Sequence, residues 1–218
     1  ELDADSVTAH RALAALLLWS APAAAQHWST PSFQSPRRAD DLGVYLIRPP
    51  EPFDGWGVAG IWRQTGNIDL GVRGGLLAAD NEFDDDTELI WILGAEASGP
   101  LALFGRGSPL LAAWSLGVGG AFNSGSIIDV PVGVSIGAQL GSPGFLIIPY
   151  VQPRASFFLS DDEFGEGDEG VDLILDVGAD FVVGENLIVR AGASFGGEDV
   201  GALGIGIAWR LARGVAVR

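Results

Sequence analysis

Residues 201–211 read GALGIGIAWRL, and every second residue of this stretch has a large apolar side chain. These side chains are Leu203, Ile205, Ile207, Trp209 and Leu211. The positions between them hold Gly, Ala and the charged Arg210. Successive side chains of a strand point to opposite faces. This period of two therefore predicts a β-strand with one apolar face, called the greasy face below, and a second face of small and partly polar side chains.

Three other stretches repeat the design: NIDLGVRGGLL (67–77), IIDVPVGVSIGAQL (127–140) and VDLILDVGADFVV (171–183). In each, Val, Ile, Leu or Phe recurs on one face, while Gly, Ser and charged residues recur on the other. The third stretch carries Asp172, Asp176 and Asp180 on its second face, which cannot face lipid. Four copies of one pattern predict an all-β chain.

The composition indicates where the greasy faces point. The chain of 218 residues has 48% hydrophobic residues, 18% charged residues and 32 Gly. It contains no uninterrupted apolar run of about 18 residues, the length a spanning helix needs, so a lipid-embedded form must use strands closed into a barrel. The fold class expected is a closed antiparallel transmembrane β-barrel.

A soluble barrel also alternates, but it places the large apolar residues inside and exposes Lys, Glu and Thr. Here the second face consists mainly of Gly, Ala and Ser with a few Asp and Arg, and the chain has no Lys. That face suits a crowded lumen better than a solvated surface. The greasy face is therefore expected to point outward, with a soluble secreted lipid-binding barrel as an alternative.

The pattern predicts about ten strands, with eight as an alternative count. The expected ranges are 42–48, 55–64, 67–78, 88–97, 110–122, 127–140, 145–159, 171–183, 187–195 and 201–211. Short turns such as 65–67, 142–144 and 184–186 alternate with long acidic connections such as 79–88 and 160–170. Outer-membrane barrels have short periplasmic turns and longer external loops, so the acidic loops are assigned to the cell exterior.

The N-terminus has the order of a secretory signal. Arg11 precedes an apolar run from Ala12 to Trp19, and small residues at Ala23 and Ala25 predict cleavage after Ala25. The expected organisation is a signal segment at 1–25, whose first residues need not be translated in the cell, and a mobile periplasmic lead at 26–40. The barrel follows at 41–211, with a C-terminal tail at 212–218.

The stretches DVPVGVSIGAQLGSPGFLIIPYVQPRASF (129–157) and GIGIAWRL (204–211) resemble the small bacterial outer-membrane β-barrel proteins of the OmpA, OmpX and OmpW type. The resemblance implies a location in the bacterial outer membrane. It implies contact with membrane lipid and lipopolysaccharide, and assembly by the barrel-assembly machinery. A monomer is expected. The chain departs from the pattern at Leu211, where such proteins usually end on an aromatic residue, and in having prolines inside predicted strands.

Several activity classes are disfavoured. The chain has no Cys, and cleavage after Ala25 would leave His27 as its single His, so the sequence supports no enzyme that needs either group in its site. The formal net charge of −16 argues against binding nucleic acid through phosphates. No enzymatic activity is expected.

The lumen face is expected to hold a network of charges. Its members are Arg63, Asp69, Arg73, Glu96, Asp129, Arg154, Asp172, Asp176, Asp180, Arg190 and Arg210. Charges inside a small barrel are costly unless they are paired, so one interpretation is a salt-bridged plug with a structural or surface-interaction role. The other is a porin-like narrow channel for ions or small solutes.

Two acidic loops carry hard oxygen ligands that suit Ca²⁺, although no cofactor is required by any motif. The candidate ligands are Asp80, Glu82, Asp84, Asp85, Asp86, Asp161, Asp162 and Glu163. Neither loop has the ligand spacing of a helix-loop-helix calcium site, so a solvated acidic loop tip is the alternative.

Overall fold

The computed structural model describes residues 30–49, 54–80, 87–105, 107–123, 126–142, 144–161, 168–196 and 201–211. Regular secondary structure in these ranges consists of strands. They are β1 (Asp41–Arg48), β2 (Asp54–Gln64), β3 (Asp69–Asp80), β4 (Thr87–Pro100), β5 (Leu110–Phe122), β6 (Ser126–Ala138), β7 (Leu140–Ser142), β8 (Phe145–Asp161), β9 (Asp168–Val183), β10 (Leu187–Gly196) and β11 (Leu203–Arg210). The described part of the chain contains no helix that is long and apolar enough to cross a membrane.

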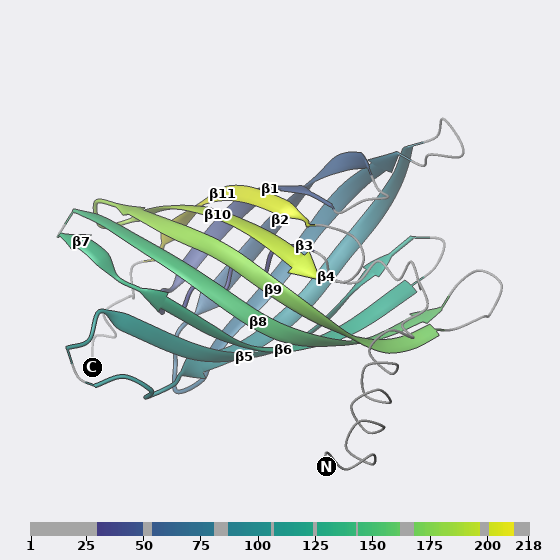
Figure 1. Ribbon diagram of the computed structural model, residues 1–218. Helices are drawn as coiled ribbons and strands as arrows, with labels where there is room; N and C mark the ends of the chain where they lie inside the picture. The colour runs from purple at the N-terminus through teal and green to yellow at the C-terminus, as the bar shows by residue number, and fades with distance from the viewer. Residues whose placement is uncertain are drawn as a thin grey trace, which may run out of the picture.

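Every strand pairs antiparallel with its neighbours, and the sheet closes on itself. β1 pairs with both β2 and β11, so the first and last strands meet (Figure 1). β6 and β7 both pair with β8 and are separated only by Gln139, so they form one interrupted strand. The described residues therefore form a ten-stranded closed barrel, which confirms the predicted fold class and favours ten strands over eight.

The prolines inside strands locally interrupt the pairing without changing its register. Between β5 and β6, the pairs Leu116↔Val132 and Gly119↔Asp129 flank a gap at Pro131. Proline has no N–H to donate to a ladder, so the gap lies where the donor is missing. The pairs on either side keep the same register, and the barrel tolerates the interruption.

The two faces of the strands are as the alternation predicts. On β11, Ile205 is 53% exposed on the outer surface, while Ala208 on the opposite face is fully buried. The large apolar side chains of the other strands are exposed in the same way, among them Leu70, Val72, Leu93, Val118, Leu159 and Leu173. The soluble lipid-binding alternative needs these side chains inside the barrel, and the structure contradicts it.

Small residues on the inner face make room for large ones from neighbouring strands. A Cβ atom added at Gly206 of β11 would lie 2.4 Å from the Cδ1 atom of Tyr45, which is fully buried on β1. A Cβ added at Gly178 of β9 would lie 2.5 Å from the ring of Tyr150 on β8. The glycines of the inner face therefore set which side chains fill the lumen.

The signal segment at 1–25 and the C-terminal tail at 212–218 lie outside the described residues. Parts of the acidic connections, including 81–86 and 162–167, lie outside them as well.

Candidate functional site

The chain that precedes β1 runs through the inside of the barrel. Residues 30–40, here named the lumen segment, have no strand pairing, and Thr30, Ser32 and Gln34 are buried. The expectation of a mobile periplasmic lead at 26–40 therefore does not hold for these residues. The physical reason is that the inner wall, lined by arginines and carboxylates, binds this polar segment. From its sequence alone the same segment is indistinguishable from a solvated linker.

The lumen segment is fixed where it joins the barrel. The Leu211 N–H donates to the Asp40 carbonyl at 2.9 Å, and the Asp40 carboxylate accepts hydrogen bonds from the Thr65 N–H at 2.5 Å and hydroxyl at 2.6 Å. Arg38 donates to Asp69 through Nε at 2.6 Å. This hydrogen bond raises the pKa of Arg38 above its ordinary value. These contacts place residue 40 at the end of the barrel that carries both termini of the sheet.

At its other end the lumen segment lies deep in the barrel. The Arg154 Nη2 group of β8 donates to the Thr30 carbonyl at 3.5 Å. A Cβ added at Gly192, in the middle of β10, would lie 3.3 Å from the Cβ of Pro31. The segment therefore enters at the rim near residue 40 and reaches the middle of the lumen near residue 30.

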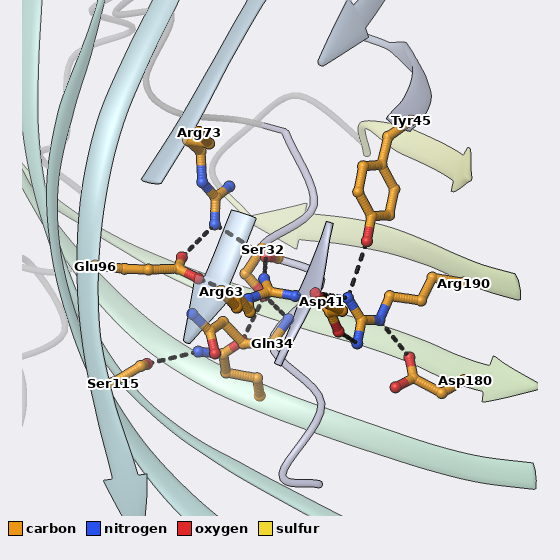
Figure 2. A network of polar contacts seen from close by, with 11 residues as sticks. Ser32, Gln34, Asp41, Tyr45, Arg63, Arg73, Glu96, Ser115, Asp180 and Arg190 are labelled. Carbon is orange, nitrogen blue, oxygen red and sulfur yellow. Dashed lines mark hydrogen bonds and ion pairs between the residues drawn. The ribbon is translucent and has the colours of Figure 1, made fainter. Parts of the chain in front are cut away.

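Two arginines of neighbouring strands share one carboxylate on a third (Figure 2). Arg63 Nε donates to Glu96 Oε1 at 2.8 Å, and Arg73 Nη2 donates to Glu96 Oε2 at 2.6 Å. All three side chains are nearly buried, with 13%, 7% and 10% of their areas exposed. Both guanidinium groups also donate to the carbonyl oxygen of Ser32, at 3.2 Å from Arg63 and 3.0 Å from Arg73.

A second buried pair lies on the opposite wall. Arg154 Nε of β8 donates to Asp176 Oδ2 of β9 at 2.9 Å, and both side chains are 2% exposed. The hydroxyl of Ser194 on β10 donates to the other oxygen of Asp176 at 2.5 Å. Three consecutive strands are thereby joined across the lumen face.

Arg190 of β10 lies at the centre of a third cluster (Figure 2). Its Nη2 donates to Asp41 Oδ2 at 2.6 Å, and its Nε donates to Asp180 Oδ1 at 3.1 Å. Its Nη1 also donates to the hydroxyl of Tyr45 at 2.9 Å. The arginine is fully buried, so its charge depends on the two carboxylates for compensation.

Neutral groups connect the lumen segment to the wall between these clusters. The Ser32 hydroxyl donates to Gln152 Oε1 at 2.5 Å, and Gln152 Nε2 donates to the Ser115 hydroxyl at 2.8 Å. Phe33 is 1% exposed and lies against Tyr45, with a ring centroid separation of 4.4 Å. The segment is therefore held by polar bonds on one side and by aromatic packing on the other.

The remaining predicted lumen charges also face inward but lie outside these clusters. Asp129 of β6 is fully buried and accepts a short hydrogen bond from the Ser156 hydroxyl. Asp172 is half-buried on β9. Arg210 lies near the rim, where Nη1 donates to the Glu185 carbonyl at 3.4 Å. The structure thus places all eleven predicted network residues on the inner face, and eight of them, with Arg38 and Asp41, form the ion pairs described above.

The sequence interpretation missed Asp41, Tyr45 and the whole lumen segment. Asp41 and Tyr45 were detectable, because the alternation of β1 places residues 41, 43, 45 and 47 on one face. The lumen segment has no periodicity, so no pattern within it could show that it lies inside the barrel.

The predicted calcium ligands come from the two acidic connections 79–88 and 160–170. Their side chains lie outside the described residues, although the backbone at Asp80 and Asp161 belongs to strands. Within the described part of the chain, no group of three or more His, Cys, Asp or Glu residues is arranged to hold a metal ion.

The arrangement is suited to binding charged or polar groups. Its arginines donate hydrogen bonds, but they stay protonated at neutral pH and so do not act as acids. The cavity bounded by Gln34, Arg38, Asp69 and Glu96 has a volume of about 30 Å³. This is room for only a few water molecules. The lumen segment therefore leaves little free volume between these side chains.

No model of a protein family matches the sequence, and no curated protein matches it. Among solved structures, the chain is similar to one described as "KdgM porin". The TM-score is 0.38 with 7% sequence identity, and the match covers 79% of this chain and 99% of that chain. A likeness this distant carries no argument about what this protein binds or transports.

Proposed function

We propose that the protein is a bacterial outer-membrane β-barrel, closed by its own lumen segment, with a structural or surface-interaction role in the cell envelope. The observation that carries the membrane location is the outer surface of the barrel. Large apolar side chains on all sides of the barrel are exposed, for example Leu46, Leu70, Leu93 and Ile205. A surface of this kind is unfavourable in water and favourable in lipid, and only closed barrels and helices satisfy their backbone groups there.

The proposal includes the partners implied by the resemblance to small barrels of the OmpA, OmpX and OmpW type. These are membrane lipid, lipopolysaccharide and the barrel-assembly machinery, with the protein as a monomer. In that proposal, Leu211 occupies the position at which barrels of this type usually have an aromatic residue. No enzymatic reaction and no nucleic acid are part of it.

The filling of the lumen by residues 30–40 is what supports the structural role. Buried ion pairs join β2, β3 and β4 through Glu96, and β8 and β9 through Asp176. The lumen segment occupies the space between these walls. Filling of the lumen by this segment, together with the ion pairs between strands, supports a structural role.

A narrow channel for ions or small solutes is the second candidate, and one observation favours it. The wall that faces the lumen segment is polar and charged, with Arg63, Arg73, Gln152 and Arg154 all bonded to it. A wall of this composition stays hydrated when the segment moves away. An apolar wall would collapse or remain dry.

The test is cell fractionation of the full chain, followed by gel migration of the detergent extract with and without heating. Recovery in the outer membrane with a heat-dependent shift is expected for a folded barrel. The same protein in planar bilayers is expected to show no steady conductance. Recovery as a soluble periplasmic monomer contradicts the membrane location, and a steady open channel in the intact protein favours the second candidate.

A further inference from the structure

The carbonyl oxygen of Ser32 lies between two guanidinium groups. Arg63 Nη2 is 3.2 Å from it and Arg73 Nη2 is 3.0 Å from it. On their other sides the same two arginines bind the two oxygens of Glu96 (Figure 2). The two cations are therefore bridged by one carboxylate and by one neutral carbonyl.

This cluster has one more positive charge than negative charge. The nearby cluster of Arg190 with Asp41 and Asp180 has the opposite excess, so the lumen as a whole is not strongly cationic. The donors at Ser32, however, point at an uncharged acceptor. An anionic acceptor adds charge–charge attraction to the hydrogen bonds of a guanidinium group, which a neutral carbonyl does not, so an anion would satisfy these donors better.

The group that occupies this position belongs to the lumen segment and not to a strand of the wall. The lumen segment belongs to no strand pairing, and its backbone makes its bonds at Ser32 and Thr30 with arginine side chains. Phe33 has a φ of 52°, a left-handed conformation that costs a bulky residue free energy. Its ring fits against Tyr45 and beside Gly192 and Gly204, which hold the strained backbone in place.

The charges of the wall remain paired without the segment. Arg63 and Arg73 keep Glu96, and Arg154 keeps Asp176. Withdrawal of the segment toward the rim would therefore leave a polar passage with two arginine donors directed into it. None of these five charged side chains would lose its counterion.

We propose that Arg63 and Arg73 form a binding site for a small anion, that the Ser32 carbonyl occupies this site in the closed barrel, and that withdrawal of the lumen segment exposes it in an ion-conducting passage. This inference rests on the channel candidate for the proposed function and names the gate and the ion class of that channel.

The first test removes the occupant. A variant that lacks residues 27–36 keeps the predicted cleavage site and the rim contacts of Arg38 and Asp40. Its folding is checked by the heat-dependent gel shift, and its conductance is measured in planar bilayers in KCl. The expected result is a folded barrel that conducts steadily, with a reversal potential in a KCl gradient that shows preference for chloride.

The anion site is tested within that deletion variant. Arg63→Gln together with Arg73→Gln is expected to shift the reversal potential toward potassium selectivity. The matched control is Arg48→Gln, which removes one positive charge at an exposed position at the other end of β1 and is expected to leave selectivity unchanged. The single variants Arg63→Gln and Arg73→Gln are compared with this control as well, because each of the three removes one positive charge.

The second test keeps the segment and locks it. The chain has no cysteine, so Pro31→Cys with Gly192→Cys introduces a single pair. The two Cβ positions are 3.3 Å apart, close to the roughly 3.8 Å of a disulfide. The reduced protein is expected to show transient openings that disappear on oxidation, while each single-cysteine variant responds to neither treatment.

A folded deletion variant without conductance would overturn the passage. Conductance whose selectivity is unchanged by the two Arg→Gln substitutions would overturn the anion site. If the deletion variant does not fold, the cysteine pair decides, because equal behaviour of its oxidised and reduced forms would also overturn the gate. None of these outcomes bears on the membrane location, which fractionation of the intact protein tests separately.

Discussion

Arg190 on β10 reaches across β11 to form an ion pair with Asp41 on β1, with 2.6 Å between Nη2 and Oδ2. The two residues are 149 positions apart in the chain and both are almost fully buried. Because β1 and β11 close the barrel, this pair lies across the closing seam. Asp180 on β9 binds the same arginine, so one side chain joins three of the four strands around the seam.

Arg190→Ala is expected to destabilise the barrel strongly. It leaves Asp41 and Asp180 buried without a counterion, and breaking a buried ion pair in this way costs about 3–5 kcal/mol. Urea unfolding in detergent or lipid, followed by the heat-dependent gel shift, measures the loss. Arg48→Ala, at an exposed position of β1, is the control and is expected to change the free energy of unfolding by less than about 0.5 kcal/mol.

Replacing all three charged groups of the seam, with Arg190→Met, Asp41→Asn and Asp180→Asn, is expected to cost less than Arg190→Ala alone. No unpaired charge then remains among the three seam residues. If the triple variant is less stable than Arg190→Ala, the ion pairs at the seam stabilise the barrel by more than the cancelling of each other's charge.

Ile205→Arg is expected to lower the free energy of unfolding in lipid by about 2–4 kcal/mol. Ile205 is 53% exposed on the outer face of β11, where the proposal places lipid. Leu103→Arg is the control, since Leu103 is 61% exposed but lies in the connection between β4 and β5. Equal effects of the two substitutions would argue against a lipid-facing surface, because a solvated surface accepts an arginine at either position.

Gly206→Ala is expected to destabilise the barrel by about 1–3 kcal/mol. The added Cβ would lie 2.4 Å from Tyr45 Cδ1 and 2.4 Å from the Val44 carbonyl oxygen, so the buried ring must move. Gly60→Ala on β2 is the matched control, because the nearest atom to its Cβ is 3.9 Å away. A thermal melt that follows the gel shift compares the two variants, and a neutral Gly206→Ala would mean that Tyr45 has room to rearrange.

Ser32→Cys is expected to react slowly with a maleimide reagent in the folded protein and fast after unfolding. Ser32 is 6% exposed in the lumen, and the chain has no native cysteine to confuse the readout. Leu103→Cys, in an exposed connection, is expected to react at once in both states. Fast labelling of Ser32→Cys in the folded barrel would indicate that the lumen segment spends much of its time outside.

The architecture of the barrel was accessible from the sequence because alternation is a local property. In 201–211, neighbours two positions apart already decide which face meets lipid, and the structure has Leu203, Ile205 and Ile207 outside. The same reasoning places Asp172, Asp176 and Asp180 inside, and it gives strand ranges that differ from the observed ones by at most a few residues. Antiparallel hairpins then follow from the short turns, since consecutive strands pair with each other.

The partners of the lumen charges were not accessible in this way. Arg63 and Arg73 lie on adjacent strands, yet their shared acceptor Glu96 and the Ser32 carbonyl come from two other segments. Which charges meet depends on strand register and on the reach of each side chain across the lumen, and alternation specifies neither.

The sequence by itself therefore determined the class of fold and the direction of each face, because these depend on which side chains favour lipid and which favour a polar interior. It left the number of strands at ten or eight, and the pairing of the closed sheet decides for ten. The tertiary structure alone decided that residues 30–40 turn back into the barrel. A polar segment without periodicity looks like a solvated linker until the arginines of distant strands converge on its carbonyl groups. Closure of the sheet creates that convergence, and with it the difference between a filled barrel and an open one.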